Sequence, residues 1–189
     1  MIEPKKIIIV SGKRKSGKDY FSDLLSSKIG FEHCDIIRLS SPLKEQYAKI
    51  HNLDFTRLLD SSSYKEKYRD DMIKWGESER NKDSEVFCRL ATQIASKPIW
   101  IVTDARRPSD IEYFQKYYRE KTILLRISCS DTTRINRGWK FVSGIDDAPS
   151  ECALDGIEWD FVVHNDDNNN DTNVHAISNK IQKLLHVLL

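Results

Sequence analysis

The sequence predicts an α/β fold built on a mainly parallel five-stranded sheet. Segments in which apolar residues recur at helical spacing alternate with short apolar runs, which is the order of a β-α-β chain. The runs are apolar almost throughout, as expected for strands that are buried on both faces. The five predicted strands are 6–10, 34–39, 98–103, 122–127 and 160–164.

Helix boundaries follow from the residues that flank each apolar stripe. The helix after the first strand is expected to end at Gly30, because glycine is common just past a helix C-terminus. Ser41-Pro42 provides an N-cap and a first helical residue, so the next helix is expected to start there and to run through Tyr47. Further helical stripes occupy 64–75, 86–94, 111–118 and 174–188.

Two stretches interrupt the alternation. Residues 42–97 show helical spacing and no strand pattern, and this stretch is too long for a simple crossover. The polar run 165–173, NDDNNNDTN, is typical of an exposed connector before the last helix. We therefore predict one domain whose parts are a core of 1–41, 98–129 and 147–189, a helical substrate lobe of 42–97, and a lid of 130–146.

The composition is that of an ordinary compact protein of 189 residues. The net charge of +1 provides no overall field that would attract nucleic acid or a membrane surface. The four cysteines are widely spaced, without the pairs of a zinc site. The N-terminal apolar run of four residues is too short for a signal peptide or a membrane span. We expect a cytoplasmic monomer with small-molecule partners.

A glycine-rich loop follows the first predicted strand and precedes the first helix. Residues Gly12 to Lys18, GKRKSGK, match the pattern G-x-x-x-x-G-K. In this context backbone N–H groups can surround phosphate oxygens, and the lysine reaches the β- and γ-phosphates. A basic turn that matches by chance is the alternative, but position and spacing together favour a phosphate-binding loop.

Asp19 stands where the common loop pattern has Ser or Thr, whose hydroxyl binds Mg²⁺. A carboxylate is also a hard oxygen ligand, so Asp19 is expected to bind the metal directly or through water. A helix-capping role without catalytic function is the alternative. Four basic residues of the loop offset the added negative charge: Lys13, Arg14, Lys15 and Lys18.

Further cations follow the third and fourth predicted strands. Asp104, Arg106 and Arg107 come after the third, and ligands of open α/β sheets bind beyond such carboxyl ends. Asp104 could support a metal, and the arginines could bind an anion in bidentate fashion. After the fourth strand, Arg134 and Arg137 share a helical face, and a mobile segment could carry Arg137 to the transferred phosphoryl group. Surface charge without function is the alternative for each group.

This number of cations favours an acceptor that already carries a phosphate. Two unit charges about 4 Å apart repel by about 4 kcal/mol at an effective dielectric of about 20, and a kinase that joins ATP to a phosphomonoester must screen several such pairs. Arginines from separate segments would supply that screening. No general base is required, since an ionised phosphate oxygen is already a nucleophile.

Several sequence blocks resemble animal-type phosphomevalonate kinases. They occur in order between about residues 7 and 165: SGKRKSGKD, RLSSPLKEQYA, RLLDSSSYKEKYRDDMIKWGE, PIWIVTDARRPSDI, RGWKF and DDAPSECALD. The resemblance implies the three-layer αβα P-loop kinase fold, with a helical substrate-binding insertion and a lid. It also implies reversible, Mg²⁺-dependent transfer of the ATP γ-phosphoryl group to mevalonate 5-phosphate, in isoprenoid and sterol synthesis.

By motif match, the resemblance assigns roles to individual residues. The expected ATP-binding residues are Gly12, Lys13, Arg14, Lys15, Ser16, Gly17, Lys18, Asp19, Arg134, Arg137 and Asn165. The expected substrate-binding residues are Lys65, Arg69, Arg80, Arg106 and Arg107. The expected catalytic residues are Arg14, Lys18, Asp19 and Arg137, and the expected metal ligands are Asp19 and Asp104.

Two other functions are compatible with the loop alone. A nucleoside or deoxynucleoside monophosphate kinase would share the fold and differ in its acceptor, because a fold does not fix a substrate. A non-catalytic P-loop protein would bind nucleotide as a switch or scaffold. The combination of Lys18, Asp19, Arg107 and Arg137 favours an enzyme.

Overall fold

The computed structural model describes residues 3–60, 63–166, 179, 181–183 and 185–186. Its centre is a five-stranded sheet in the order β2-β3-β1-β4-β5, and all four strand pairings are parallel. The strands are β1 (Lys6–Ser11), β2 (Cys34–Ile37), β3 (Ile99–Val102), β4 (Thr122–Ser128) and β5 (Phe161–His164). The five predicted strands are confirmed, with ends displaced by at most two residues.

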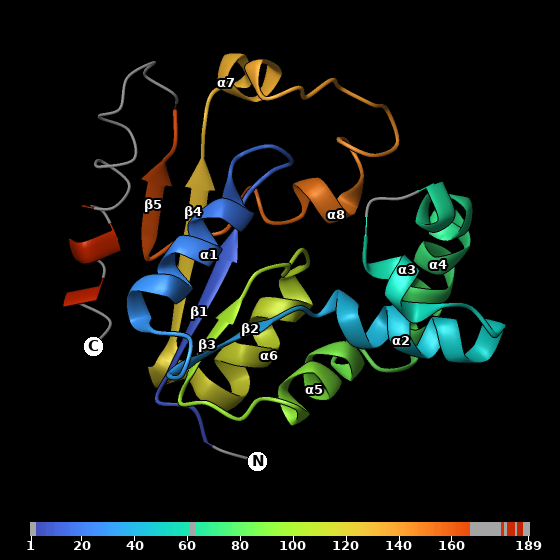
Figure 1. The fold of residues 1–189 in the computed structure, drawn as a ribbon, viewed down its shortest axis with the longest axis horizontal. Coiled ribbons are helices and arrows are strands. Elements are labelled where there is room, and N and C mark those ends of the chain that lie inside the picture. Colours follow the sequence, from blue (N-terminus) through green and yellow to red (C-terminus); the bar gives the residue numbers. More distant parts are fainter. Residues whose placement is uncertain (1–2, 61–62, 167–178, 180, 184, 187–189) are drawn as a thin grey trace.

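The helices surround this sheet and extend beyond one edge of it (Figure 1). They are α1 (Lys18–Ile29), α2 (Ser40–His51), α3 (Phe55–Leu59), α4 (Ser63–Lys82), α5 (Val86–Gln93), α6 (Pro108–Tyr118), α7 (Asp131–Asn136) and α8 (Pro149–Cys152), with a 3₁₀ turn η1 (Arg119–Lys121) before β4. Helix α1 ends at Gly30, as predicted, and this residue has φ of 97°. The predicted start of α2, with Ser41 as N-cap and Pro42 as first helical residue, is wrong by two residues. The N-cap is Leu39 and the helix begins at Ser40, because the Asp104 carboxylate accepts the N–H groups of Leu39 and Ser40.

Alternation along β1 creates two cores, one on each face of the sheet. Ile7 and Ile9 are fully buried against apolar residues of α5 and α6. Ile8 and Val10 are fully buried on the opposite face, against α1. Ile181 packs on that second face as well. The fold is therefore a three-layer αβα sandwich, as the sequence predicts.

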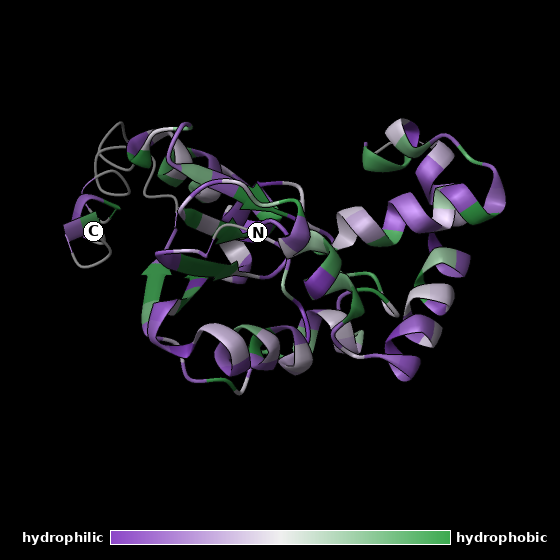
Figure 2. Cartoon of the chain, turned by 90° about the horizontal axis from the view of Figure 1, so that it is seen from below, coloured by the Kyte–Doolittle hydropathy of each residue, from purple (hydrophilic) through white to green (hydrophobic). Residues whose placement is uncertain are grey.

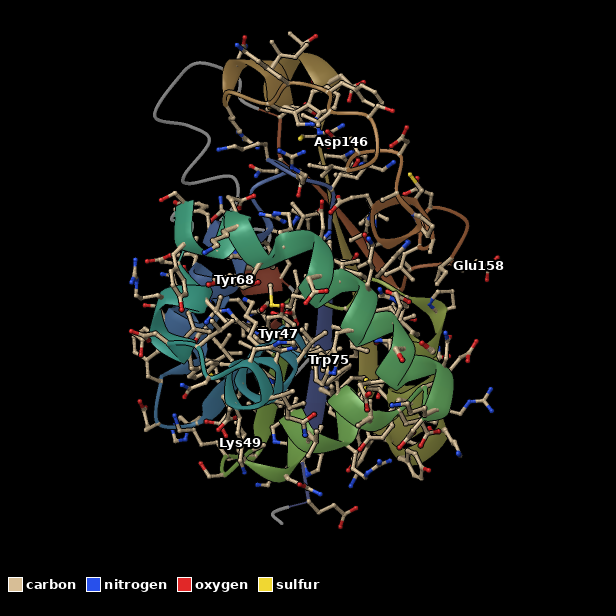
Figure 3. The ribbon with its side chains drawn as sticks, turned by 90° about the vertical axis from the view of Figure 1, so that its right-hand side faces the viewer. Tyr47, Lys49, Tyr68, Trp75, Asp146 and Glu158 are labelled. Carbon is tan, nitrogen blue, oxygen red and sulfur yellow. The ribbon has the colours of Figure 1, made fainter. Side chains whose placement is uncertain are left out.

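Helices α2, α3 and α4 form a lobe beside the sheet, on the side away from β5 (Figure 1). The lobe has a small core of its own around Tyr47, Leu58 and Met72, and Figure 3 shows Tyr47 and Trp75 inside it. The exposed faces of these helices are mainly hydrophilic (Figure 2). Helix α5, which falls within the predicted lobe, packs its Cys88 in the core of the sheet.

The last predicted elements lie largely outside the described residues. This applies to most of the connector 165–173 and of the helix 174–188; residues 179, 181–183 and 185–186 are helical. Ile94, predicted to lie on an apolar helix face, is 79% exposed just after α5. Within the described part of the chain, no helix is both long and apolar enough to cross a membrane.

Candidate active site

The loop between β1 and α1 has the backbone of a phosphate-binding turn. Gly17 has φ of 88° immediately before α1, and Lys15 has φ of 62°. A Cβ atom on Gly12 would lie 2.8 Å from the Ile127 carbonyl oxygen, so this position requires glycine. A positive φ is energetically unfavourable for a residue with a side chain, such as Lys15. Strained backbone of this kind is concentrated at ligand-binding and active sites. The loop lies at the carboxyl end of β1, beneath α7 and beside α8 in Figure 1.

Arg134, Arg137 and Asn165 contact the carbonyl groups of this loop. The Arg134 Nε atom donates to the Arg14 carbonyl at 2.9 Å. Arg137 and Asn165 both donate to the Ser16 carbonyl, at 3.1 and 2.8 Å. In a trans peptide the N–H group points opposite to the carbonyl, so the Gly17 N–H is directed away from Asn165. The three residues thus lie beside the loop, and they hold its peptide groups in one orientation; direct contact of their side chains with a nucleotide stays a prediction.

Gly17 and Asn165 are packed so closely that we expect Gly17→Ala to be strongly destabilising. The new Cβ would lie 2.2 Å from the Asn165 side-chain nitrogen, in addition to the strain of a positive φ. A loss of at least about 2 kcal/mol, or roughly 4–8 °C in melting temperature, should accompany loss of turnover. Gly144→Ala is the matched control, since Gly144 has φ of 80° and nothing within 4 Å. Equal melting temperatures for the two variants would contradict the packing argument.

The Ser16 hydroxyl provides a test of whether the loop fits a nucleotide phosphate. Its oxygen is buried and has no hydrogen-bond partner among the described residues. It lies 2.5 Å from the position that a Cβ on Gly12 would occupy, so it faces the loop. A buried hydroxyl without a partner is costly, and a phosphate oxygen held by the loop would accept its hydrogen bond. The loop therefore fits the phosphate chain of ATP.

Lys18 and Asp19 open helix α1 at the end of the loop. The Lys18 ammonium lies 2.6 Å from an Asp19 carboxylate oxygen. The Lys18 side chain is 12% exposed and that of Asp19 is 79% exposed. Among the residues that the structure describes, no three His, Cys, Asp or Glu side chains form a ready-made metal cage. Asp19 is thus an accessible carboxylate beside the loop lysine, which fits an ion bound mainly by phosphate and water oxygens.

A pocket joins the phosphate loop to the segment after β3. It is lined by Ser11, Gly12, Lys18, Asp104, Ala105, Arg106, Arg126, Ser150, Glu151 and Leu154. The loop and Arg106 therefore share one cleft at the carboxyl ends of the parallel strands, where the sequence predicts a site. Arg126 reaches the same cleft from β4, and its guanidinium donates to Ser11 Oγ at 3.1 Å.

Asp104 lines this pocket but already has a structural role. One of its carboxylate oxygens accepts the Leu39 N–H at 2.6 Å, and the other accepts the Ser40 N–H at 3.0 Å. These bonds cap α2 and tie the lobe to the end of β3. In this structure Asp104 caps α2. Metal binding by Asp104 stays a prediction.

Carboxylates pair with several of the cations that were predicted to bind phosphates. Lys13 lies 2.6 Å from Asp155, and Arg14 lies 2.9 Å from Asp146. Two further ion pairs form between the segment after β3 and other parts of the chain: Arg106 with Glu151, and Arg107 with Glu77. The pairs balance the cationic charge within the protein and fix the direction of each side chain.

The lobe contributes a second group of cations. Burial lowers the pKa of Lys44, the nearby Lys65 lowers it further, Asp104 opposes the shift, and Arg38 and Arg69 add to it. Lys44 thus lies within electrostatic reach of these residues, among them Asp104, which lines the pocket. Arg69 also pairs with Glu66 on its own helix.

Arg80, the third predicted lobe residue, projects from α4 toward α5. Its guanidinium lies 4.7 Å from the centre of the Phe87 ring. Its charge also acts on Cys88, whose pKa is raised mainly by burial and then by Asp110, while Arg80 opposes the rise. Arg80 therefore extends from α4 to the first turn of α5.

Comparison with known proteins identifies the family. A family model described as phosphomevalonate kinase matches residues 10–120, which is more than half of the chain. A phosphomevalonate kinase of Drosophila melanogaster is 41% identical over 184 residues, covering 94% of this chain and 97% of the fly protein. The chain belongs to the phosphomevalonate kinase family. It is therefore an ATP-dependent kinase.

Solved structures of other kinases share the fold of this phosphomevalonate kinase family member. Shikimate kinase from Bacteroides thetaiotaomicron has a TM-score of 0.57 at 12% identity, and the match covers 96% of this chain and 98% of that one. Shikimate kinase from Acinetobacter baumannii, solved in complex with shikimate, has a TM-score of 0.51 at 12% identity, with coverage of 98% and 96%. At such low identity these similarities show the P-loop kinase fold alone.

Some residues of the site were not assigned from the sequence. Arg38 directly follows β2. The argument used for Asp104, that ligands bind beyond the carboxyl ends of parallel strands, could have identified Arg38 as well. Lys44 is one of many basic residues in the lobe sequence, and Arg126 lies within a predicted strand, so no local pattern marks either residue. Asp146 and Glu151 gave no usable signal, because their partners lie far away in the sequence.

Proposed function

We propose that this chain catalyses reversible transfer of the ATP γ-phosphoryl group to (R)-5-phosphomevalonate, giving 5-diphosphomevalonate and ADP in the mevalonate pathway. The observation that carries the proposal is the pocket in which Gly12 and Lys18 face Arg106. A phosphate donor on the loop and a phosphorylated acceptor on the β3 side would meet there. Family membership supports phosphomevalonate as that acceptor.

The basic residues divide into a donor side and an acceptor side. On the donor side, backbone N–H groups of the loop, Ser16 Oγ and Lys18 bind the ATP phosphates, with Arg14 and Lys13 at the rim. Asp19 would hold Mg²⁺ directly or through water, and the ion would neutralise charge on the phosphates. The acceptor side consists of Lys65, Arg69, Arg80, Arg106 and Arg107.

Transfer in this site requires positioning and charge screening more than proton removal. The terminal phosphate oxygen of the acceptor is already ionised, so it attacks the γ-phosphorus without a general base. Lys18 and Arg106 face the same cleft and lower the repulsion between the two polyanions. Arg137 acts on the loop carbonyls, and we infer that it supports the nucleotide site from there. The protein is further proposed to act as a monomer in the cytoplasm. Its four cysteines form no disulfide, which fits a reducing compartment.

A panel of acceptors tests the proposal. Purified protein with ATP and Mg²⁺ is offered phosphomevalonate, mevalonate, CMP and dAMP, and ADP formation is followed in a coupled assay. We expect turnover with phosphomevalonate alone. Turnover of CMP or dAMP without phosphomevalonate would identify a nucleoside monophosphate kinase. Tight ATP binding without any transfer would identify a non-catalytic P-loop protein.

A further inference from the structure

Asp146 is the last residue of the predicted lid and lies beside the phosphate loop, just before α8. Figure 3 shows it below the α7 segment and above the loop that follows β1. Its Oδ2 atom accepts hydrogen bonds from Arg14 Nη1 at 2.9 Å and from the Val142 N–H at 2.8 Å. Its Oδ1 atom accepts the Trp139 indole N–H at 2.9 Å. One carboxylate thus joins two residues of the lid to the side chain of a loop arginine.

The surroundings of Asp146 keep it charged. Its side chain is 4% exposed, and burial by itself would raise its pKa. The hydrogen bonds from Trp139 and Val142, and the charges of Arg14 and Arg134, outweigh burial and lower the pKa below its ordinary value. A buried carboxylate with this many donors is fixed in direction, because any rotation would break several hydrogen bonds together.

Arg14 is held at two points by the same part of the lid. Asp146 binds its guanidinium, and the Arg134 side chain binds its carbonyl. Arg134 is itself fixed, since its guanidinium lies 3.7 Å from the centre of the Trp139 ring. The backbone and the side chain of Arg14 therefore depend on one cluster, made of Arg134, Trp139 and Asp146.

We propose that Asp146 is a positioning residue, which orients the Arg14 guanidinium toward the nucleotide phosphates. Arginine has five N–H donors, so one bond to Asp146 leaves others available for phosphate oxygens. The Arg14 side chain is 35% exposed, whereas Asp146 is buried behind it. Asp146 acts through Arg14 and does not touch the nucleotide. This proposal rests on the proposed function, in which Arg14 binds ATP.

The competing role for Asp146 is to fold the lid alone, through Val142 and Trp139. A double-mutant cycle with Arg14→Met and Asp146→Asn separates the two roles, because residues that act together give non-additive effects. Asparagine keeps the shape of the side chain but loses the charge, and its single oxygen cannot serve donors on both sides. We expect Asp146→Asn alone to lower kcat/KM for ATP by roughly tenfold, and to have little further effect in the Arg14→Met background.

The affinity for ADP with Mg²⁺, measured by calorimetry without acceptor, provides a readout that does not depend on the acceptor's identity. We expect this affinity to fall by a similar factor in Asp146→Asn and to be equal in Arg14→Met and the double variant. Failure of the acceptor panel would overturn the proposed function but would leave this measurement intact. Effects of Asp146→Asn that are equal in both backgrounds, or absent in both, would overturn the positioning role.

Asp147→Asn is the matched control. Asp147 is the next residue and is exposed, and it accepts bonds from Ser143 Oγ and the Gly144 N–H within the lid. ADP affinity and kcat/KM should not change in this variant. A loss equal to that of Asp146→Asn would show that any damage to the lid has the same effect, and would overturn the proposal. If Asp146→Asn does not fold, Asp146→Glu replaces it in the double-mutant cycle with Arg14→Met. Glutamate keeps the negative charge but displaces the carboxylate group.

Discussion

Lys18→Met is expected to lower kcat by roughly 10²–10³-fold or more while the protein stays folded. Lys18 lines the pocket, and it is the cation whose position in the loop matches the lysine that reaches the β- and γ-phosphates. Removal of one preorganised electrostatic contact to a developing charge typically costs this factor. Methionine retains the unbranched chain, so packing at the start of α1 is preserved. Single-turnover kinetics with saturating ATP measures the effect on the chemical step.

Stability should change little in Lys18→Met. The ion pair that Lys18 forms is with Asp19, whose side chain is largely exposed, and such pairs contribute about 0–1 kcal/mol. Lys28→Met is the matched control, because Lys28 is an exposed lysine in the last turn of the same helix. Its kcat should equal that of the unmodified protein. Normal turnover in Lys18→Met would exclude this lysine from the phosphate site.

The sheet and the phosphate loop could be predicted because their signals are local. Buried parallel strands are short apolar runs, and β1 shows this in Ile7, Ile8 and Ile9, which face two cores. The loop is specified by glycines whose conformation the chain requires, such as Gly17 with its positive φ. Each of these features depends on residues that are adjacent in the sequence.

Other parts of the site depend on contacts between distant residues. Asp104 resembles a metal ligand at a strand end, yet it caps α2, whose N-terminus lies 64 and 65 residues away along the chain. Asp146 pairs with Arg14 across 132 residues, and no local pattern marks either as the other's partner. In a sequence, carboxylates near a phosphate site cannot be distinguished from ordinary surface charges. Their role depends on the cation that each one orients, and that cation lies far away in the sequence.

One experiment distinguishes the two possible roles of Asp19, metal binding and helix capping. We expect Asp19→Asn to lower kcat by roughly 10–100-fold and to raise the Mg²⁺ concentration needed for half-maximal rate by a similar factor. The amide oxygen of asparagine is a neutral and weaker ligand for a hard cation than a carboxylate is. Asparagine is also a good residue near a helix N-terminus, so α1 should remain intact. Initial rates over a range of Mg²⁺ concentrations, at fixed ATP, measure both changes.

Two comparisons make the Asp19 result specific. Asp23→Asn changes an exposed carboxylate four residues further along α1, and its Mg²⁺ dependence should match the unmodified protein. ADP affinity measured with and without Mg²⁺ gives the second comparison. If Asp19 helps to hold the ion, the gain in affinity on adding Mg²⁺ is smaller in Asp19→Asn, whereas a capping residue would leave the gain unchanged. An unchanged gain together with unchanged rates would assign Asp19 to the helix alone, and the metal would then depend on the phosphates and water.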